Sequence, residues 1–263
     1  WAASCCPTEK TPKAVPDPTK SAEKQCSKED TSKIQEILKK MNKAAENLKS
    51  CQADIKYLSI NDPELLNTKI LRNGTLYYKK EKAGSNLRIQ FSDLKQDDFE
   101  TEKQREEYLF DGVWLTRINY KLEQIDLYQQ APEDKPIGVF ELISHNFPLI
   151  GFTGTENIEK EFDISLDPAA RDPNEPACLI LKVKKDSKFN DSYKKIKFWV
   201  DNKLNLPRKI IAIAPQGDES HIEFSYEKVN KKLKNGVFTI ETPAHFSKNI
   251  EQLETIKQTE KKP

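Results

Sequence analysis

The hydrophobic positions along the chain repeat first with a helical period and then with a period of two. Between Ser32 and Leu48, apolar residues recur every three or four positions, and Ser32 followed by Gln35 fits a capping box. After Cys51, apolar and polar residues alternate, as in strands with one buried face. The pattern predicts an amphipathic helix that packs on a following sheet, because a lone helix of this length is not stable in water.

Short runs with this alternation continue along most of the chain, and turn signals such as Asp111-Gly112 separate them. The connections are too short for helical crossovers, so we expect antiparallel hairpins. The expected strands are residues 53–60, 70–78, 87–91, 108–110, 113–119, 124–128, 161–166, 178–184, 194–200, 208–214, 221–227 and 237–241.

One hydrophobic segment, residues 137–152, does not alternate regularly between apolar and polar residues, which predicts one or two short helices packed inward. Its residues either form a plug or lid over the sheet or are simply core. A sheet with this many strands curls and encloses a lumen. The predicted fold is therefore mainly β with α: a single curled antiparallel sheet that forms an unclosed β-barrel of about eleven strands, with an N-terminal helix and a helical plug. The candidate plug residues are Phe140, Leu142, Ile143, Phe147, Leu149 and Ile150.

Composition divides the chain into three parts. Residues 1–30 are rich in Pro, Lys, Thr and Ser and poor in aliphatic residues, which predicts a flexible tether. Residues 31–246 would form one domain, and the Lys-, Gln- and Glu-rich residues 247–263 would be a frayed tail. With 43 Lys and Arg against 42 Asp and Glu, we expect no nucleic-acid partner.

The start of the sequence suggests export. The chain opens on Trp1, so we expect that a signal peptide lies upstream of this sequence and that the protein is periplasmic. Ala2-Ala3-Ser4-Cys5 is similar to the end of a bacterial lipoprotein signal, which makes Cys5 a candidate for acylation and membrane anchoring. The alternative is an ordinary cysteine in a flexible tail.

The sequence offers little for catalysis. The five cysteines have no metal-site or redox spacing, and Cys51 and Cys178 would be either a disulfide or two free buried thiols. The three histidines are scattered, and no nucleophile elbow, phosphate loop or dinucleotide fingerprint is present. The acidic pairs Asp97-Asp98 and 172–175 lie in polar, turn-like stretches. We expect no catalytic residue, no metal, no cofactor and no enzymatic activity.

Several sequence motifs along the chain resemble those of the outer-membrane lipoprotein carrier (LolA-like) family. They are residues 73–80 followed by 87–89, the hairpin Phe110-Asp111-Gly112-Val113-Trp114-Leu115, the run of strands 179–183, 196–201 and 206–210, and a closing motif over residues 235–243. The resemblance covers roughly residues 32–246. One departure is that residues 79–83 read Lys-Lys-Glu-Lys-Ala, without the family's Arg-Pro pair, and a lysine cannot reproduce the planar donor fork of arginine.

The resemblance implies a non-enzymatic carrier that holds acyl chains of lipoproteins or other lipids in a hydrophobic lumen. Its partners would be membrane-bound donor and acceptor proteins, and we expect a monomer. The alternatives are a lipid-sensing regulator on the same fold and an anchored interaction protein whose lumen is filled by its own side chains. Period two leaves open which sheet face points inward. The candidate lumen residues on the sheet are Tyr57, Leu76, Tyr78, Leu87, Ile89, Phe91, Trp114, Phe198 and Ile210.

Overall fold

The computed structural model describes residues 28–61, 64, 66–81, 84–139, 152, 156–168 and 176–253. Within these residues, twelve strands form one sheet, and two helices accompany it. The elements are α1 (Lys28–Glu46), β1 (Ser50–Asn61), β2 (Thr68–Glu81), β3 (Gly84–Gln96), β4 (Glu102–Phe110), β5 (Trp114–Asn119), β6 (Gln124–Gln129), α3 (Glu156–Glu161), β7 (Phe162–Leu166), β8 (Cys178–Val183), β9 (Lys195–Val200), β10 (Pro207–Ile213), β11 (Glu219–Val229) and β12 (Ser247–Glu251).

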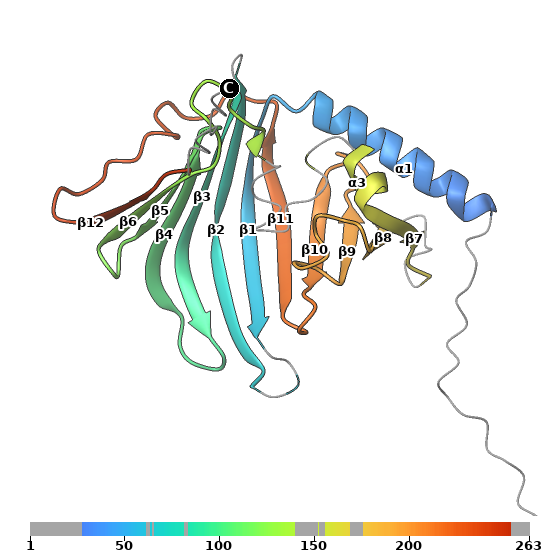
Figure 1. Cartoon of the computed structure of the whole chain (residues 1–263), viewed down its shortest axis with the longest axis horizontal. Helices are drawn as coiled ribbons and strands as arrows, with labels where there is room; N and C mark the ends of the chain where they lie inside the picture. Colours follow the sequence, from blue (N-terminus) through green and yellow to red (C-terminus); the bar gives the residue numbers. More distant parts are fainter. Residues whose placement is uncertain are drawn as a thin grey trace, which may run out of the picture.

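The sheet is curled and remains open. Its strand order is β12-β6-β5-β4-β3-β2-β1-β11-β10-β9-β8-β7. The strands β1–β6 therefore form one half and β7–β11 the other, and the pairing of β1 with β11 joins the two halves. The two edge strands, β12 and β7, do not pair with each other. Figure 1 shows the long strands in the centre bending around a concave face. This arrangement confirms the predicted fold class, a single unclosed curled sheet with an N-terminal helix.

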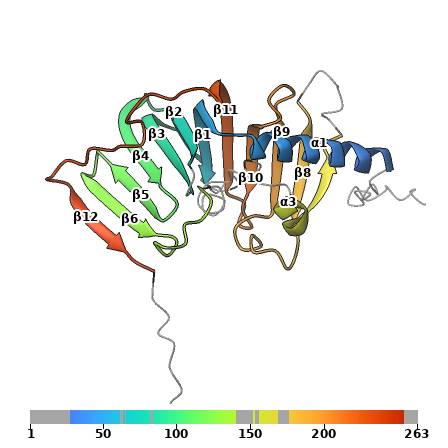
Figure 2. The same cartoon turned by 90° about the horizontal axis from the view of Figure 1, so that it is seen from above.

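Helix α1 covers one half of the sheet. Figures 1 and 2 show α1 lying across the β7–β10 half, where it contacts β7. The residues Ile34, Leu38 and Met41 are almost completely buried and belong to the same hydrophobic core as the sheet residues. The apolar stripe predicted from helical spacing is therefore the face that packs on the sheet.

The hairpin between β4 and β5 shows how local sequence sets the register. Asp111 Oδ1 accepts hydrogen bonds from the amides of Val113 (2.9 Å) and Trp114 (2.8 Å). Gly112 has a φ of 103°, which a residue with a side chain rarely adopts. The Asp-Gly turn thereby places Phe110 directly opposite Leu115.

The C-terminal part differs from expectation in two ways. Residues 237–241 were expected to form a strand, but they lie in a turn and an extended connection. Instead Ser247–Glu251, expected to fray, forms β12, which is parallel to β6 while all other pairs are antiparallel. Residues 230–246, which we call the C-terminal strap, connect β11 to β12 along the outside of the sheet (Figure 2).

A buried ion-pair cluster on the convex face fastens the strap. The carboxylate of Glu107 is fully buried and accepts hydrogen bonds from Arg88 Nη2 (2.6 Å) and Arg105 Nε (2.6 Å). Arg88 Nη1 also donates to the backbone carbonyl of Val237 in the strap (2.7 Å). Because this carbonyl accepts from a side chain, the Val237 region is held on the sheet without joining its ladder. The aromatic contact of Tyr120 with Phe246 (5.6 Å between ring centroids) adds a second attachment.

The two cysteines of the domain are free thiols. Cys51 and Cys178 are both buried and are not bonded to each other. Of the two alternatives, the structure therefore has two free thiols and no disulfide between them. Burial raises the pKa of the Cys51 thiol to about 12, and burial together with nearby Asp167 raises that of Cys178 to about 11. Since the thiolate is the reactive species, both side chains should be inert near neutral pH.

We therefore predict that a chain with Cys5, Cys6 and Cys26 replaced by Ser reacts negligibly with a thiol reagent at pH 8. In denaturant, where the thiol pKa returns to about 8.5, both cysteines should react fully. Colorimetric thiol titration of the native and the unfolded chain measures this. Rapid labelling of the native chain would contradict the buried placement.

We also predict that Glu107→Ala lowers the free energy of unfolding by about 3–5 kcal/mol, because it leaves the buried Arg88 without its carboxylate. Arg105 is about half exposed, with 48% of its side-chain surface accessible, so Arg105→Ala should cost no more than about 1 kcal/mol. Urea unfolding of both variants gives the comparison. Equal losses of unfolding free energy in the two variants would show that the buried Arg88–Glu107 pair does not stabilise the fold more than the half-exposed Arg105 does.

Candidate functional site

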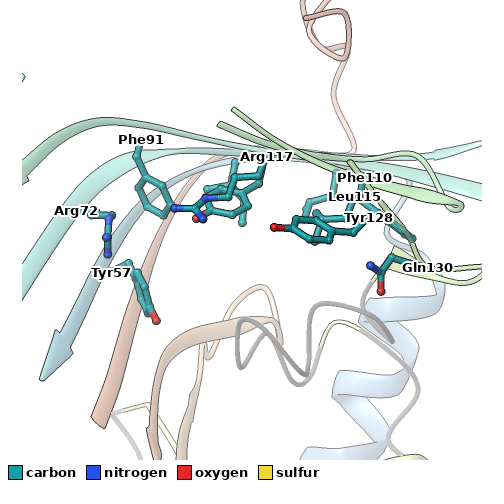
Figure 3. A pocket seen from close by; sticks show the side chains of 11 residues that line it. Tyr57, Arg72, Phe91, Phe110, Leu115, Arg117, Tyr128 and Gln130 are labelled. Atoms are coloured by element: carbon teal, nitrogen blue, oxygen red, sulfur yellow. The ribbon is translucent and has the colours of Figure 1, made fainter. Parts of the chain in front are cut away.

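A cavity of about 500 Å³ opens on the concave face of the β1–β6 half of the sheet. Figure 3 shows side chains from several strands converging on it. Most of the wall is aliphatic or aromatic, and one region is polar. The lining residues are Tyr57, Arg72, Leu87, Ile89, Phe91, Tyr108, Phe110, Leu115, Arg117, Tyr128 and Gln130.

Strand alternation and register explain why these side chains share a face. Residues directly opposite each other on paired strands point to the same side. Leu87 is opposite Phe110, which is in turn opposite Leu115, and Leu115 is opposite Tyr128. One row of apolar side chains therefore crosses four strands and forms a continuous wall of the cavity.

Four of the predicted lumen residues line this cavity: Tyr57, Leu87, Ile89 and Phe91. Leu76, Tyr78, Phe198 and Ile210 lie on the same concave face by register, but they are buried in the hydrophobic core and are not part of the cavity wall. The candidate plug residues (Phe140, Leu142, Ile143, Phe147, Leu149 and Ile150) and Cys5 lie outside the described residues.

Trp114 does not face the cavity. Its neighbour Leu115 lines the wall, and successive residues of a strand point to opposite faces. The Trp114 side chain is therefore on the convex face, where it is half-buried. The prediction that placed it in the lumen was wrong, and the reason is the one-residue ambiguity inherent in a period of two.

Aromatic rings shape the centre of the cavity. The Phe91 ring contacts Tyr57 at 6.3 Å between centroids and Tyr108 at 6.2 Å, the second pair being edge to face. Aromatic pairs of this kind resist rearrangement because they combine large buried area with a preferred geometry. The three rings come from β1, β3 and β4, so they connect the middle strands of the sheet within the cavity wall.

A buried charged cluster forms the polar region, which sequence reasoning missed. Glu106 is almost completely buried, with 3% of its side-chain surface accessible, and lies beside two arginines. Arg117 Nη2 is 2.7 Å from Glu106 Oε1, and Arg72 Nε is 3.6 Å from Glu106 Oε2. The hydroxyl of Tyr108 donates to Glu106 Oε1 (3.0 Å). Arg72 Nε itself is buried without a hydrogen bond, so one donor in the cavity wall is unsatisfied.

These contacts fix the charge states of the cluster. Burial and the neighbouring Glu106 carboxylate raise the pKa of Tyr108 well above its usual range, so its phenol stays protonated and remains a donor. Burial alone lowers the pKa of Arg117, but Tyr108 and Glu106 outweigh it and the net pKa is raised. The polar region therefore presents guanidinium and phenol groups to an otherwise apolar cavity.

The signal that could have revealed this cluster is the pair Glu106-Glu107. Two successive carboxylates in a strand cannot both face water if one sheet face is core, because one of them must point inward. Glu106 points to the concave face and Glu107 to the convex face, and each finds arginine partners there. To infer from the sequence that both carboxylates are buried, one must already know that both faces of β4 are covered.

No group of three or more His, Cys, Asp or Glu side chains able to hold a metal ion occurs within the described ranges. The helices of the described part are also too short or too polar to cross a membrane.

Fold and cavity together define a half-open β-barrel protein with an apolar pocket on its concave face. No protein-family model matches the chain, and no curated protein matches it. Solved structures of other proteins are similar at the level of the fold, and their sequence identity to this chain is low.

Three of these structures are as follows. An uncharacterized conserved protein from Thermus thermophilus is 12% identical over 83% of this chain and 99% of its own, with a TM-score of 0.46. The lipoprotein LppX from Mycobacterium tuberculosis is 8% identical over 77% and 98%, with a TM-score of 0.44. A LolA superfamily protein from Nitrosomonas europaea is 13% identical over 78% and 97%, with a TM-score of 0.31.

Gly74 permits the close strand approach that positions the centre of the cavity. It lies opposite Phe91 at a register shift of β2 against β3. A Cβ added at Gly74 would come within 2.8 Å of the Phe91 Cα and still closer to the Gln90 carbonyl oxygen. Only a residue without a side chain fits there unless the two strands separate.

We predict that Gly74→Ala lowers the free energy of unfolding by about 1–3 kcal/mol and weakens binding of any ligand that contacts Phe91. The neighbouring Thr75→Ala is the control, because its side chain points to the other face of β2. Chemical unfolding and ligand titration of both variants measure the effects. A Gly74→Ala chain that behaved like the Thr75→Ala chain would contradict the close approach.

Proposed function

We propose that this protein is a non-enzymatic periplasmic carrier that binds acyl chains of lipoproteins or other lipids in the concave cavity and moves them between membranes. The observation that supports it most is the cavity of about 500 Å³ on the concave face, most of whose wall is aliphatic or aromatic. This volume lies within the range of small-molecule sites, about 300–1,000 Å³. The proposal needs no catalytic group, since binding and release alone perform the function.

The energetics favour an acyl chain. Each buried methylene contributes about 0.8 kcal/mol, so ten of them could supply about 8 kcal/mol before the cost of immobilising the ligand. The wall formed by Leu87, Ile89, Phe110 and Leu115 offers the apolar contacts for the chain. The polar groups of Arg72, Arg117 and Tyr108 would lie near the head of an amphiphile rather than along its tail.

We predict that Leu115→Asp weakens binding of a fluorescent acyl probe at least about tenfold, because the variant places a carboxylate in the apolar wall. Leu127→Asp is the matched control: Leu127 is also half-buried, on the neighbouring strand β6, but it is opposite Thr116 and so faces the other side of the sheet. Probe titration of both variants measures the difference, and their unfolding curves show that both are folded. Equal loss in both variants, or no saturable binding by the unaltered chain, would contradict the proposal.

Carriage and sensing make different predictions beyond binding. A carrier should accelerate transfer of a labelled lipid from donor to acceptor vesicles in proportion to its concentration, and Leu115→Asp should abolish the acceleration. A lipid-sensing regulator or interaction protein on the same fold would bind the lipid without accelerating its transfer. A vesicle transfer assay with self-quenched lipid separates the two functions.

A further inference from the structure

A second hollow, separate from the cavity, lies at the end of the sheet where α1 leads into β1, β2 ends and the C-terminal strap begins. It has a volume of about 590 Å³. The start of β1 and the end of β2 lie at the upper edge of the sheet in Figure 1. We call it the basic groove because its lining includes six lysines and one carboxylate, Glu81. The lysines are Lys49, Lys79, Lys80, Lys231, Lys232 and Lys234.

The charge of this groove is local, since the chain as a whole carries a formal net charge of only +1. All six lysines are exposed. Lys79 pairs with Glu81 at 2.7 Å, and the other five make no ion pair among the residues that the structure describes. The groove therefore concentrates positive charge, because its lining alone carries more net positive charge than the whole chain.

Backbone hydrogen bonds hold the lysine-bearing segments together. Lys80 donates its amide to the carbonyl of Lys49 (2.7 Å), and Ser50 Oγ donates to the carbonyl of Lys231 (2.8 Å). The side-chain Oδ1 of Asn230 accepts a hydrogen bond from the backbone amide of Lys49 (2.7 Å). The backbone amide of Asn230 donates to the carbonyl of Ser50 (2.8 Å). Three segments that are far apart in the sequence thus present their ammonium groups from one fixed framework.

Apolar side chains lie between these lysines. Leu233, Val237 and Phe238 line the groove and are half-buried. Lysines with long apolar stems beside aliphatic and aromatic residues are typical of surfaces that enter the headgroup layer of a bilayer. The strap that carries them is fastened by the Arg88 bond to the Val237 carbonyl, so the surface is preformed.

We propose that the basic groove docks the protein on a membrane surface that contains anionic phospholipids. Lysine ammonium groups would contact the headgroup phosphates, and the apolar residues of the strap would enter the interface beneath them. A nucleic-acid backbone offers the phosphates without the apolar layer, so it leaves Phe238 and Leu233 without a counterpart.

The test is sedimentation of the full chain with vesicles of phosphatidylglycerol and phosphatidylcholine, compared with vesicles of phosphatidylcholine alone. The groove variant is Lys231→Glu, Lys232→Glu, Lys234→Glu. The control variant is Lys182→Glu, Lys185→Glu, Lys194→Glu, which changes the net charge equally at exposed lysines of β8 and of the connection to β9. A duplex oligonucleotide serves as a second polyanion, free of any bilayer.

We expect binding to the anionic vesicles only, a loss of at least about tenfold in the groove variant and little change in the control variant. Raising the salt from about 0.1 M to about 1 M, which shortens the Debye length from about 10 Å to about 3 Å, should release the protein. Equal losses in both variants, no binding to anionic vesicles, or groove-dependent binding to the oligonucleotide that exceeds vesicle binding would each overturn the proposal.

This surface is independent of the acyl cavity. The Leu115→Asp chain should still sediment with anionic vesicles, whereas the groove variant should still bind a soluble acyl probe. Failure of one property with retention of the other therefore identifies which of the two proposals is wrong.

Discussion

Helix α1 is shorter than the sheet is wide, and the rest of the structure depends on this difference in length. A helix of 19 residues is about 28 Å long, whereas twelve strands spaced about 4.8 Å apart extend about 50 Å across. Helix α1 can thus cover about half of the concave face, and it covers the β7–β10 half. In the described part of the chain, the apolar face of β1–β6 is left with a cavity, and sheet curvature brings its walls toward each other.

Strand β4 links that cavity to the outside of the sheet. Glu106 and Glu107 are neighbours in the chain, yet one is bound by arginines in the cavity wall and the other by arginines beneath the C-terminal strap. Buried carboxylates with several donors are costly to rearrange, because any shift leaves a charge unpaired. The cavity, the strap and the basic groove at the start of the strap are therefore held on one rigid framework.

Much of this architecture follows from the sequence, and the exceptions have physical causes. Helical spacing between Ser32 and Leu48 and alternation along the strands were sufficient to predict α1 and eleven of the twelve strands. Trp114 was placed on the wrong face because a period of two gives two equivalent choices until a neighbouring strand fixes the register. The strap and β12 were missed because residues 237–241 look like a strand locally, but their backbone is held by the distant side chain of Arg88. The pair Glu106-Glu107 is a local signal for an inward carboxylate, but its partners Arg72 and Arg117 lie on β2 and β5, and no local pattern contains the strand pairing that brings them to β4.

The central claim is that the concave cavity holds an acyl chain, and the most direct test is to identify what the protein carries. The full chain would be purified without detergent from bacterial cells, and its organic-solvent extract analysed by lipid mass spectrometry beside that of a Leu115→Trp variant, whose larger side chain fills the cavity. The account predicts acyl lipid in the first extract, near one molecule per chain, and its loss from the second. Extracts free of lipid from both proteins, or equal amounts of lipid in both, would contradict it.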